Sequence, residues 1–217
     1  MPSKKMFCQN WKLYVITDSR SLRVGDLRQA VLAAVKGGAD VIQLRDKTLS
    51  DPEMTRLAVS ILEITRPNRV PLIINDRLRV ALDSGADGLH LGQEDGSMAE
   101  ARLALGEKAF LGRSTHSMEQ ALAAEKEDAD YIGIGPVFQT PTKAEYVPVG
   151  LELISFAAKN LSVPFVAIGG IDRTNASLVR EAGARTIAVV RSVMASSDPE
   201  NSARNLKRIM EGKRETS

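Results

Sequence analysis

The segment Gly38-Ala39-Asp40-Val41-Ile42-Gln43-Leu44-Arg45-Asp46-Lys47 contains a small-residue turn, a short apolar run and a polar end. The apolar run predicts a buried β-strand, and side chains alternate between the two faces of a strand. Gln43, Arg45 and Lys47 therefore share one face, whereas Leu44 and Asp46 share the other. Two cations that converge at a strand end suit a phosphorylated ligand. The alternative is that they only end the strand in water.

The turn at the start of this segment belongs to an internal repeat. Gly85-Ala86-Asp87, Asp128-Ala129-Asp130 and Gly183-Ala184-Arg185 also precede apolar runs, and the four turns are spaced by 47, 43 and 55 residues. A glycine, or its substitute Asp128, is expected to end one helix and lead into the next strand. Because each interval holds about two βα units, the repeat favours an eightfold βα barrel. A doubly wound open sheet is the competing architecture.

Short runs rich in Val and Ile alternate with stretches of helical period along the chain. The predicted strands are Leu13–Thr17, Val41–Leu44, Leu72–Ile74, Gly88–Leu91, Phe110–Gly112, Tyr131–Ile134, Phe165–Ile168 and Ile187–Val190. The predicted helices are Asp26–Lys36, Pro52–Thr65, Leu78–Asp83, Met98–Leu105, Met118–Lys126, Leu151–Lys159, Asn175–Glu181 and Pro199–Met210. We expect a single-domain α/β protein, a (β/α)8 TIM barrel over residues 13–212. Residues 1–12 are expected to form a loosely held tail, and residues 213–217 a second tail.

The composition limits the classes of function. The net charge is only +2 and no basic block stands out, so nucleic-acid binding is not indicated. No run approaches the roughly 20 apolar residues that span a bilayer, and the first residues lack the apolar core of a signal peptide. The single Cys8 excludes an intrachain disulfide and fits a reducing compartment. We expect a cytoplasmic protein without membrane contact that acts on small-molecule substrates, and a homo-oligomer is left open.

Polar residues follow the predicted strands, at the end of a barrel where active sites lie. Asn75 and Asp76 follow the third strand, and Asp95 follows the fourth. Two carboxylates at neighbouring strand ends suit Mg²⁺, which prefers oxygen ligands and keeps several waters when it bridges phosphates. The alternative is that Asp76 caps a helix and Asp95 belongs to a solvated turn. Beside Arg45 and Lys47, a metal and diphosphate site is the better interpretation.

The fifth and sixth strands also end in polar residues. Ser114 is expected to point inward and donate to a phosphate, whereas His116 is more often a structural cap than a general base. After the sixth strand, Thr140-Pro141-Thr142-Lys143 combines two hydroxyls with a compact positive charge. A plain surface loop is the alternative for the threonines, but it does not account for their position beside Lys143 at a strand end.

A second anion site is expected after the last two strands. Gly169-Gly170 follows the seventh strand and Val190-Arg191-Ser192 follows the eighth. Adjacent glycines leave backbone N–H groups open to a phosphate, and the loops after strands seven and eight are the common phosphate site of this barrel class. One site is thus expected to take a diphosphate with metal, and the other a monophosphate.

Several of these motifs, in this order, resemble those of the thiamine-phosphate synthase family. They are QLRDK at 43–47, Asn75-Asp76, HLGQED at 90–95, STH at 114–116, TPTK at 140–143 and AIGGI at 167–171. The resemblance runs from Leu13 to about Met194. It implies a (β/α)8 barrel that joins hydroxymethylpyrimidine diphosphate to a thiazole phosphate and releases diphosphate, with Mg²⁺ as cofactor.

The resemblance also implies roles for individual residues. The pyrimidine diphosphate site comprises Gln43, Leu44, Arg45, Asp46, Lys47, Asn75, Ser114 and Lys143. Among these, Arg45, Lys47, Ser114 and Lys143 are the expected catalytic residues, with the three cations stabilising the leaving diphosphate. The magnesium ligands are Asp76 and Asp95. The thiazole phosphate site comprises Thr140, Pro141, Thr142, Gly170, Val190 and Arg191.

Two positions depart from the family pattern. Arg191 stands where serine is usual, which is tolerable if only the backbone N–H binds phosphate, and its guanidinium can itself grip a phosphate. Asp46 stands where glutamate is commoner, and it is expected to face away from the mouth. Two other functions remain open: a related thiazole tautomerase, in which His116 gains weight as an acid–base group, and a catalytically silent phosphate-ligand binder on the same barrel.

Overall fold

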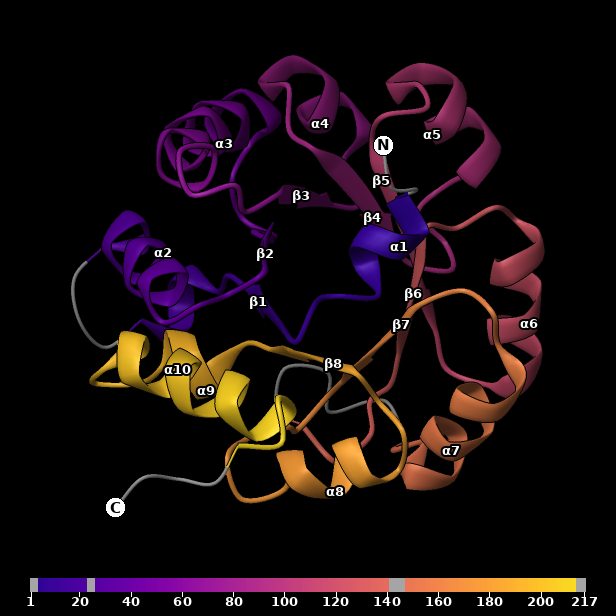
Figure 1. Ribbon diagram of the computed structural model, residues 1–217. Helices are drawn as coiled ribbons and strands as arrows, with labels where there is room; N and C mark the ends of the chain where they lie inside the picture. Colours follow the sequence, from indigo (N-terminus) through magenta and orange to yellow (C-terminus); the bar gives the residue numbers. More distant parts are fainter. Residues whose placement is uncertain (1–3, 23–25, 141–146, 214–217) are drawn as a thin grey trace.

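The computed structural model describes residues 4–22, 26–140 and 147–213. Within them, parallel strands pair in chain order and the last pairs with the first, which closes a barrel (Figure 1). The strands are β1 Leu13–Ile16, β2 Val41–Leu44, β3 Leu72–Asn75, β4 Gly88–Leu91, β5 Phe110–Thr115, β6 Tyr131–Ile134, β7 Phe165–Ile168 and β8 Thr186–Val189. The predicted eightfold barrel is therefore confirmed.

Most of the helices surround the strands on the outside of the barrel (Figure 1). They are α1 Lys4–Cys8, η1 Ser19–Ser21, α2 Leu27–Lys36, α3 Asp51–Thr65, α4 Leu78–Ser84, α5 Met98–Leu105, α6 Met118–Lys126, α7 Gly150–Asn160, α8 Ala176–Glu181, α9 Arg191–Met194 and α10 Pro199–Met210. Every helix predicted from the sequence is present, whereas α1, η1 and α9 were not expected. Among the described residues, no helix has the length and apolar character needed to cross a membrane.

The repeated turn performs the same task at each position. Gly38, Gly85, Asp128 and Gly183 all have positive φ, between 58° and 110°, as the end of a helix in a left-handed residue requires. The aspartates of three turns then bind the start of a neighbouring strand. Asp40, Asp87 and Asp130 accept backbone N–H groups of Leu13, Leu72 and Leu111, at 2.9 to 3.0 Å. The turn therefore fixes both the helix end and the strand alignment.

Alternation along the strands separates two apolar layers. One face of each strand packs against the surrounding helices, as Ile42 and Leu44 of β2 do. The other face points into the barrel, where Tyr14, Val41 and Tyr131 form an inner cluster. Strands buried on both faces need apolar side chains at nearly every position. A polar side chain on the inner face is therefore unusual, and such residues mark the candidate site.

The prediction of a loosely held N-terminal tail is wrong for the described residues from Lys4 onward. Helix α1 lies across the amino-terminal end of the barrel (Figure 1), and Cys8 and Trp11 are buried. The Phe7 ring lies 5.7 Å from that of Phe110, and Lys4 pairs with Asp130 at 3.1 Å. These contacts close the end of the barrel opposite the site. Residues 1–3 and 214–217 lie outside the described part.

Candidate active site

A cavity of about 340 Å³ opens at the carboxyl ends of the strands. Its walls combine apolar side chains such as Ile16, Val166 and Ile168 with polar groups from neighbouring strands. The polar side chains predicted for the site that line it are Gln43, Arg45, Asn75, Ser114, Thr140 and Arg191. The structure thus brings residues that are up to about 150 positions apart in the sequence to one cavity.

The end of β2 and the loop after it follow the predicted alternation only as far as Arg45. Gln43 is almost completely buried and faces the cavity, whereas Leu44 packs outward against the helices. Arg45 lines the cavity, and hydrogen bonds between its backbone and the Thr17 hydroxyl hold it at the strand end. Lys47 does not line the cavity. Its exposed ammonium instead donates to the carboxylate of Asp76.

The Asp46 side chain does not line the cavity and instead makes hydrogen bonds with nearby loop residues. Its carboxylate accepts hydrogen bonds from the Ser19 hydroxyl at 2.7 Å, from the Thr48 N–H and hydroxyl at 2.8 and 2.6 Å, and from the Leu49 N–H at 3.1 Å. Burial opposes ionisation, but these hydrogen bonds together outweigh it and lower the pKa of Asp46 from 3.8 to about 2. Its expected role in substrate binding is therefore indirect, through the shape of the loop.

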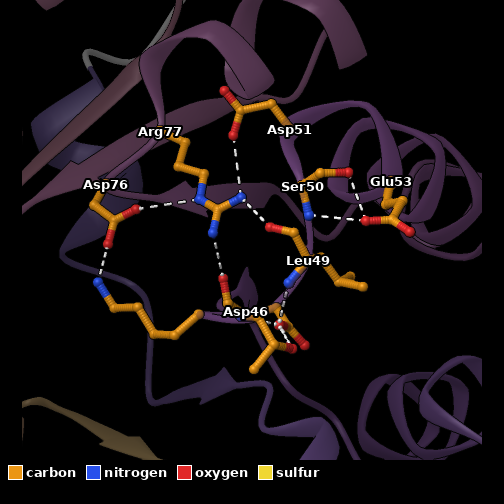
Figure 2. Close-up of polar contacts among 9 residues, drawn as sticks. Asp46, Leu49, Ser50, Asp51, Glu53, Asp76 and Arg77 are labelled. Carbon is orange, nitrogen blue, oxygen red and sulfur yellow. Dashed lines mark hydrogen bonds and ion pairs between the residues drawn. The ribbon is translucent and has the colours of Figure 1, made fainter.

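Arg77 fixes the same loop from the other side, as Figure 2 shows. Its guanidinium donates to the carbonyl oxygens of Leu49 at 2.6 Å and Asp46 at 3.1 Å, and to the Asp51 carboxylate at 3.1 Å. Its Nε also lies 3.9 Å from the Asp76 carboxylate. A planar guanidinium can serve several acceptors in a fixed arrangement. Arg77 was not among the site residues predicted from the sequence.

Asp76 and Asp95, the expected magnesium ligands, follow the adjacent strands β3 and β4. The Asp76 N–H donates to the His90 carbonyl at 2.9 Å, which joins the two strand ends. Asp76 has a φ of 55°, a left-handed conformation that aspartate tolerates better than most residues. The Asp95 carboxylate accepts the Gly92 N–H at 2.7 Å.

Two carboxylates suit a magnesium ion that keeps most of its water ligands and also binds substrate phosphates. Among the described residues, no three or more His, Cys, Asp or Glu side chains gather as a metal cage. A Mg²⁺ that keeps its waters and bridges substrate phosphates needs only one or two carboxylates. Asp76 and Asp95 follow neighbouring strands, but neither is among the residues that line the cavity, so their role as magnesium ligands stays a prediction.

A chain of hydrogen bonds crosses the floor of the cavity. It runs from Gln43 through Tyr14, Tyr131 and His90 to Ser114, with donor–acceptor distances of 2.8, 2.9, 3.0 and 2.8 Å. All five side chains line the cavity. Tyr14, His90 and Tyr131 were not predicted as site residues. The alternation of side chains along β4 could have identified His90 as a site residue. His90 pairs in register with Asn75 of β3, and both residues line the cavity.

His116 and the loop after β6 complete one wall. The His116 ring bonds to the Gly135 carbonyl through Nδ1, which fits a structural role for this side chain. Its backbone N–H donates to Gln120 at 2.7 Å. Thr140 lines the cavity, whereas the predicted site residues Pro141, Thr142 and Lys143 lie outside the described residues.

The predicted monophosphate site lies on the adjoining wall, after β7 and β8. Gly170, Val190 and Arg191 all line the cavity, and Gly170 has a φ of 64°. A Cβ at Gly170 would lie 2.6 Å from the Gln139 carbonyl oxygen, so this position has no room for a larger residue. The Ser192 hydroxyl donates to the Ile171 carbonyl at 2.6 Å. Ser192 therefore joins the two loops and does not stand in for the serine that Arg191 replaces.

A closed (β/α)8 barrel with a polar cavity at the carboxyl ends of its strands defines a barrel enzyme. The chain belongs to the thiamine monophosphate synthase family, whose model matches residues 13–193. It is 44% identical over 202 residues to a thiamine-phosphate synthase of Chloroflexus aurantiacus, covering 93% of each chain. It is 42% identical over 207 residues to one of Syntrophomonas wolfei, covering 95% of this chain and 99% of the relative.

A solved structure supports the same assignment. Thiamine phosphate pyrophosphorylase from Pyrococcus furiosus superimposes with a TM-score of 0.86 at 37% identity, covering 94% of this chain and 98% of the other. The resemblance in the sequence motifs is thus confirmed at the level of family and fold, and the chain is a transferase of that family.

Proposed function

We propose that the protein couples hydroxymethylpyrimidine diphosphate with a thiazole phosphate to form thiamine phosphate and diphosphate. The observation that carries this proposal is the convergence of Gln43, Arg45, Asn75 and Ser114 on one cavity. These residues offer amide, guanidinium and hydroxyl groups to a substrate with a polar ring and a charged tail. The family of its relatives supports the same reaction.

The two substrates occupy different walls in this proposal. The pyrimidine ring lies over Gln43 and Ser114, and its diphosphate extends toward Arg45 and Lys47. The thiazole phosphate is held near Gly170 and Arg191, where the loops after β7 and β8 meet. Thr140 lines the same cavity, and Thr142 and Lys143 are expected from the sequence to bind substrate phosphates.

Asp76 and Asp95 would hold the magnesium ion at the diphosphate end. When bound, the ion supplies positive charge to the diphosphate oxygens. The Lys47 ammonium is paired with the Asp76 carboxylate in the structure. It would therefore leave Asp76 when the diphosphate enters. The released lysine then contacts the diphosphate.

The chemistry needs charge stabilisation more than proton transfer. The bond between the pyrimidine methylene carbon and the diphosphate oxygen breaks, and diphosphate leaves with the electron pair. The lone pair of the thiazole nitrogen attacks the resulting cation and forms the C–N bond. The nitrogen carries no proton, so no general base is required. The positive charges of Arg45, Lys47 and Lys143 would stabilise the departing oxygen and lower the barrier.

A coupling assay tests the proposal directly. Purified protein is incubated with pyrimidine diphosphate, thiazole phosphate and Mg²⁺, and thiamine phosphate is measured by fluorescence after oxidation. We expect product that depends on both substrates and disappears with EDTA. Folded protein that makes no product under these conditions would contradict the proposal.

A further inference from the structure

The hydrogen-bond chain on the cavity floor has a direction. The Gln43 amide nitrogen donates to the Tyr14 hydroxyl. A phenol has one proton, and in the direction that we infer Tyr14 accepts from Gln43 and gives its proton to the Tyr131 hydroxyl, 2.9 Å away. Burial raises the pKa of both phenols, so each keeps its proton. The orientation at the first residue therefore dictates the orientation at the next.

The same count of protons can be followed along the hydrogen-bond chain to Ser114. Tyr131 has accepted from Tyr14, and its proton goes to Nδ1 of His90 at 3.0 Å. A histidine that accepts at Nδ1 in its neutral form carries its proton on Nε2. That N–H donates to the Ser114 hydroxyl oxygen at 2.8 Å. Ser114 is then left with its own O–H to donate into the cavity, and Gln43 with its Oε1 to accept there.

Two glycines of the barrel wall make space for this hydrogen-bond chain. Gly112 of β5 and Gly133 of β6 lie against it, and a methyl group at position 112 would collide with both Tyr131 and the His90 ring. At Gly133 a Cβ would lie 3.2 Å from His90 Cε1. Below the chain, the Trp11 ring packs edge-on against Tyr131 at 5.4 Å. The Tyr131 and His90 side chains are therefore packed closely, which obstructs rotation to other partners.

We propose that Tyr14, Tyr131 and His90 are positioning residues that fix Gln43 as an acceptor and Ser114 as a donor. This polarity matches the amino-substituted ring of the proposed pyrimidine substrate and disfavours the corresponding oxo ring. An aminopyrimidine offers N–H donors and ring-nitrogen acceptors, whereas in the oxo form the carbonyl accepts and the adjacent ring N–H donates. The choice of substrate rests on the proposed function, but the direction of the chain does not.

The opposite direction makes the inference falsifiable. If the Gln43 amide were turned over, every hydrogen bond would reverse, Ser114 would donate to His90, and the histidine proton would sit on Nδ1. The two directions thus differ in one observable, the tautomer of His90. The reversed chain would present an N–H donor from Gln43, which suits an oxo ring.

Long-range ¹⁵N NMR of the ligand-free protein reads this tautomer. The chain has two histidines, so a His116→Gln variant assigns the His90 signals. We expect neutral His90 with its proton on Nε2, and Tyr131→Phe should introduce the Nδ1–H form, because Nδ1 loses its donor. An Nδ1–H tautomer in the unaltered protein would overturn the inference.

Kinetics test the consequence for substrate choice. We expect kcat/KM for the amino pyrimidine diphosphate to exceed that for the oxo analogue by about 100-fold or more. Tyr131→Phe should reduce this ratio at least about tenfold through the KM for the pyrimidine, with the KM for the thiazole phosphate unchanged. Unaltered selectivity in a folded Tyr131→Phe protein would overturn the inference.

The design separates the possible failures. Thermal melting checks the fold of Tyr131→Phe, and Tyr14→Phe interrupts the chain one step earlier if the first variant does not fold. If the unaltered protein couples neither pyrimidine, the proposed function fails, and the His90 tautomer alone decides the inference.

Discussion

The Lys47 ammonium donates to the Asp76 carboxylate, which joins the loop after β2 to the end of β3. In the proposed reaction these two groups have different partners, the diphosphate for Lys47 and the metal for Asp76. The Lys47 side chain is 49% exposed, and exposed ion pairs contribute only about 0–1 kcal/mol. Breaking this pair therefore costs little, and the ligand-free site keeps its charges balanced until diphosphate and metal enter together.

Removing a cation at the diphosphate end should slow the chemical step. We expect Arg45→Ala and Lys143→Ala each to lower kcat by about 10²–10³-fold, because a fixed donor to developing charge is worth about 3–4 kcal/mol. Steady-state kinetics with thermal melting measure the effect and the fold. Arg79→Ala is the matched control, because Arg79 is exposed and pairs with Asp83 on its own helix. Turnover near that of the unaltered protein in Arg45→Ala or Lys143→Ala would contradict charge stabilisation.

Neutralising a magnesium ligand should raise the metal requirement. Asp76→Asn and Asp95→Asn are each expected to increase the Mg²⁺ concentration for half-maximal rate about tenfold or more, since each loses a charged oxygen donor. The measurement is the coupling rate over a Mg²⁺ titration. Glu94→Gln removes the same charge from an exposed neighbour of Asp95 and should leave the titration unchanged. An equal shift in all three variants would indicate a general charge effect.

Arg77 should act on the reaction through the loop that it holds. We expect Arg77→Ala to lower kcat about tenfold or more and to speed amide hydrogen exchange at Thr48 and Leu49, because the loop loses three hydrogen bonds. Arg77→Lys keeps the charge but lacks the planar fork, so it should not rescue either property. Arg79→Ala again serves as control. Slower turnover without faster exchange would assign Arg77 a direct contact with substrate instead.

The Asp46 carboxylate should make stability depend on acid pH. Its pKa in the folded protein, about 2, lies below the ordinary 3.8, so the stabilisation is present above pH 4 and is lost as pH falls toward 2. Asp46→Asn should lower the free energy of unfolding by about 2 kcal/mol at pH 7. Denaturant unfolding at several pH values should show this difference shrinking between about pH 4 and 2. A difference independent of pH would exclude the titration of Asp46 as its cause.

The fold follows from local patterns that the sequence states plainly. The turns at Gly38, Gly85, Asp128 and Gly183 and the runs after them predicted the barrel, because the left-handed residue and the apolar strand are both local requirements. Strand β5 is longer than predicted, since Ser114 and Thr115 continue to pair with β6 although their side chains are polar. Pairing with a neighbouring strand is not visible in composition.

Features held by distant contacts were harder to predict. Helix α1 is five residues long, and such a short helix is unstable by itself, so its position depends on partners such as Phe110 and Asp130. Among the site residues, the polar residues at or just beyond the ends of the predicted strands were found, whereas His90 and Tyr131 were taken as part of the strand core. Their role appears only when the barrel brings β1, β2, β4, β5 and β6 around one cavity.

The aromatic packing beneath the cavity gives the protein a built-in optical reporter. Trp11 is the single tryptophan of the chain, it is buried, and its ring lies 5.4 Å from Tyr131. Tyr131 in turn lines the cavity and belongs to its hydrogen-bonded floor. Indole emission responds to changes in nearby polar groups, so a ligand that engages this floor should shift the intrinsic fluorescence. Occupancy of the site can therefore be followed without a label.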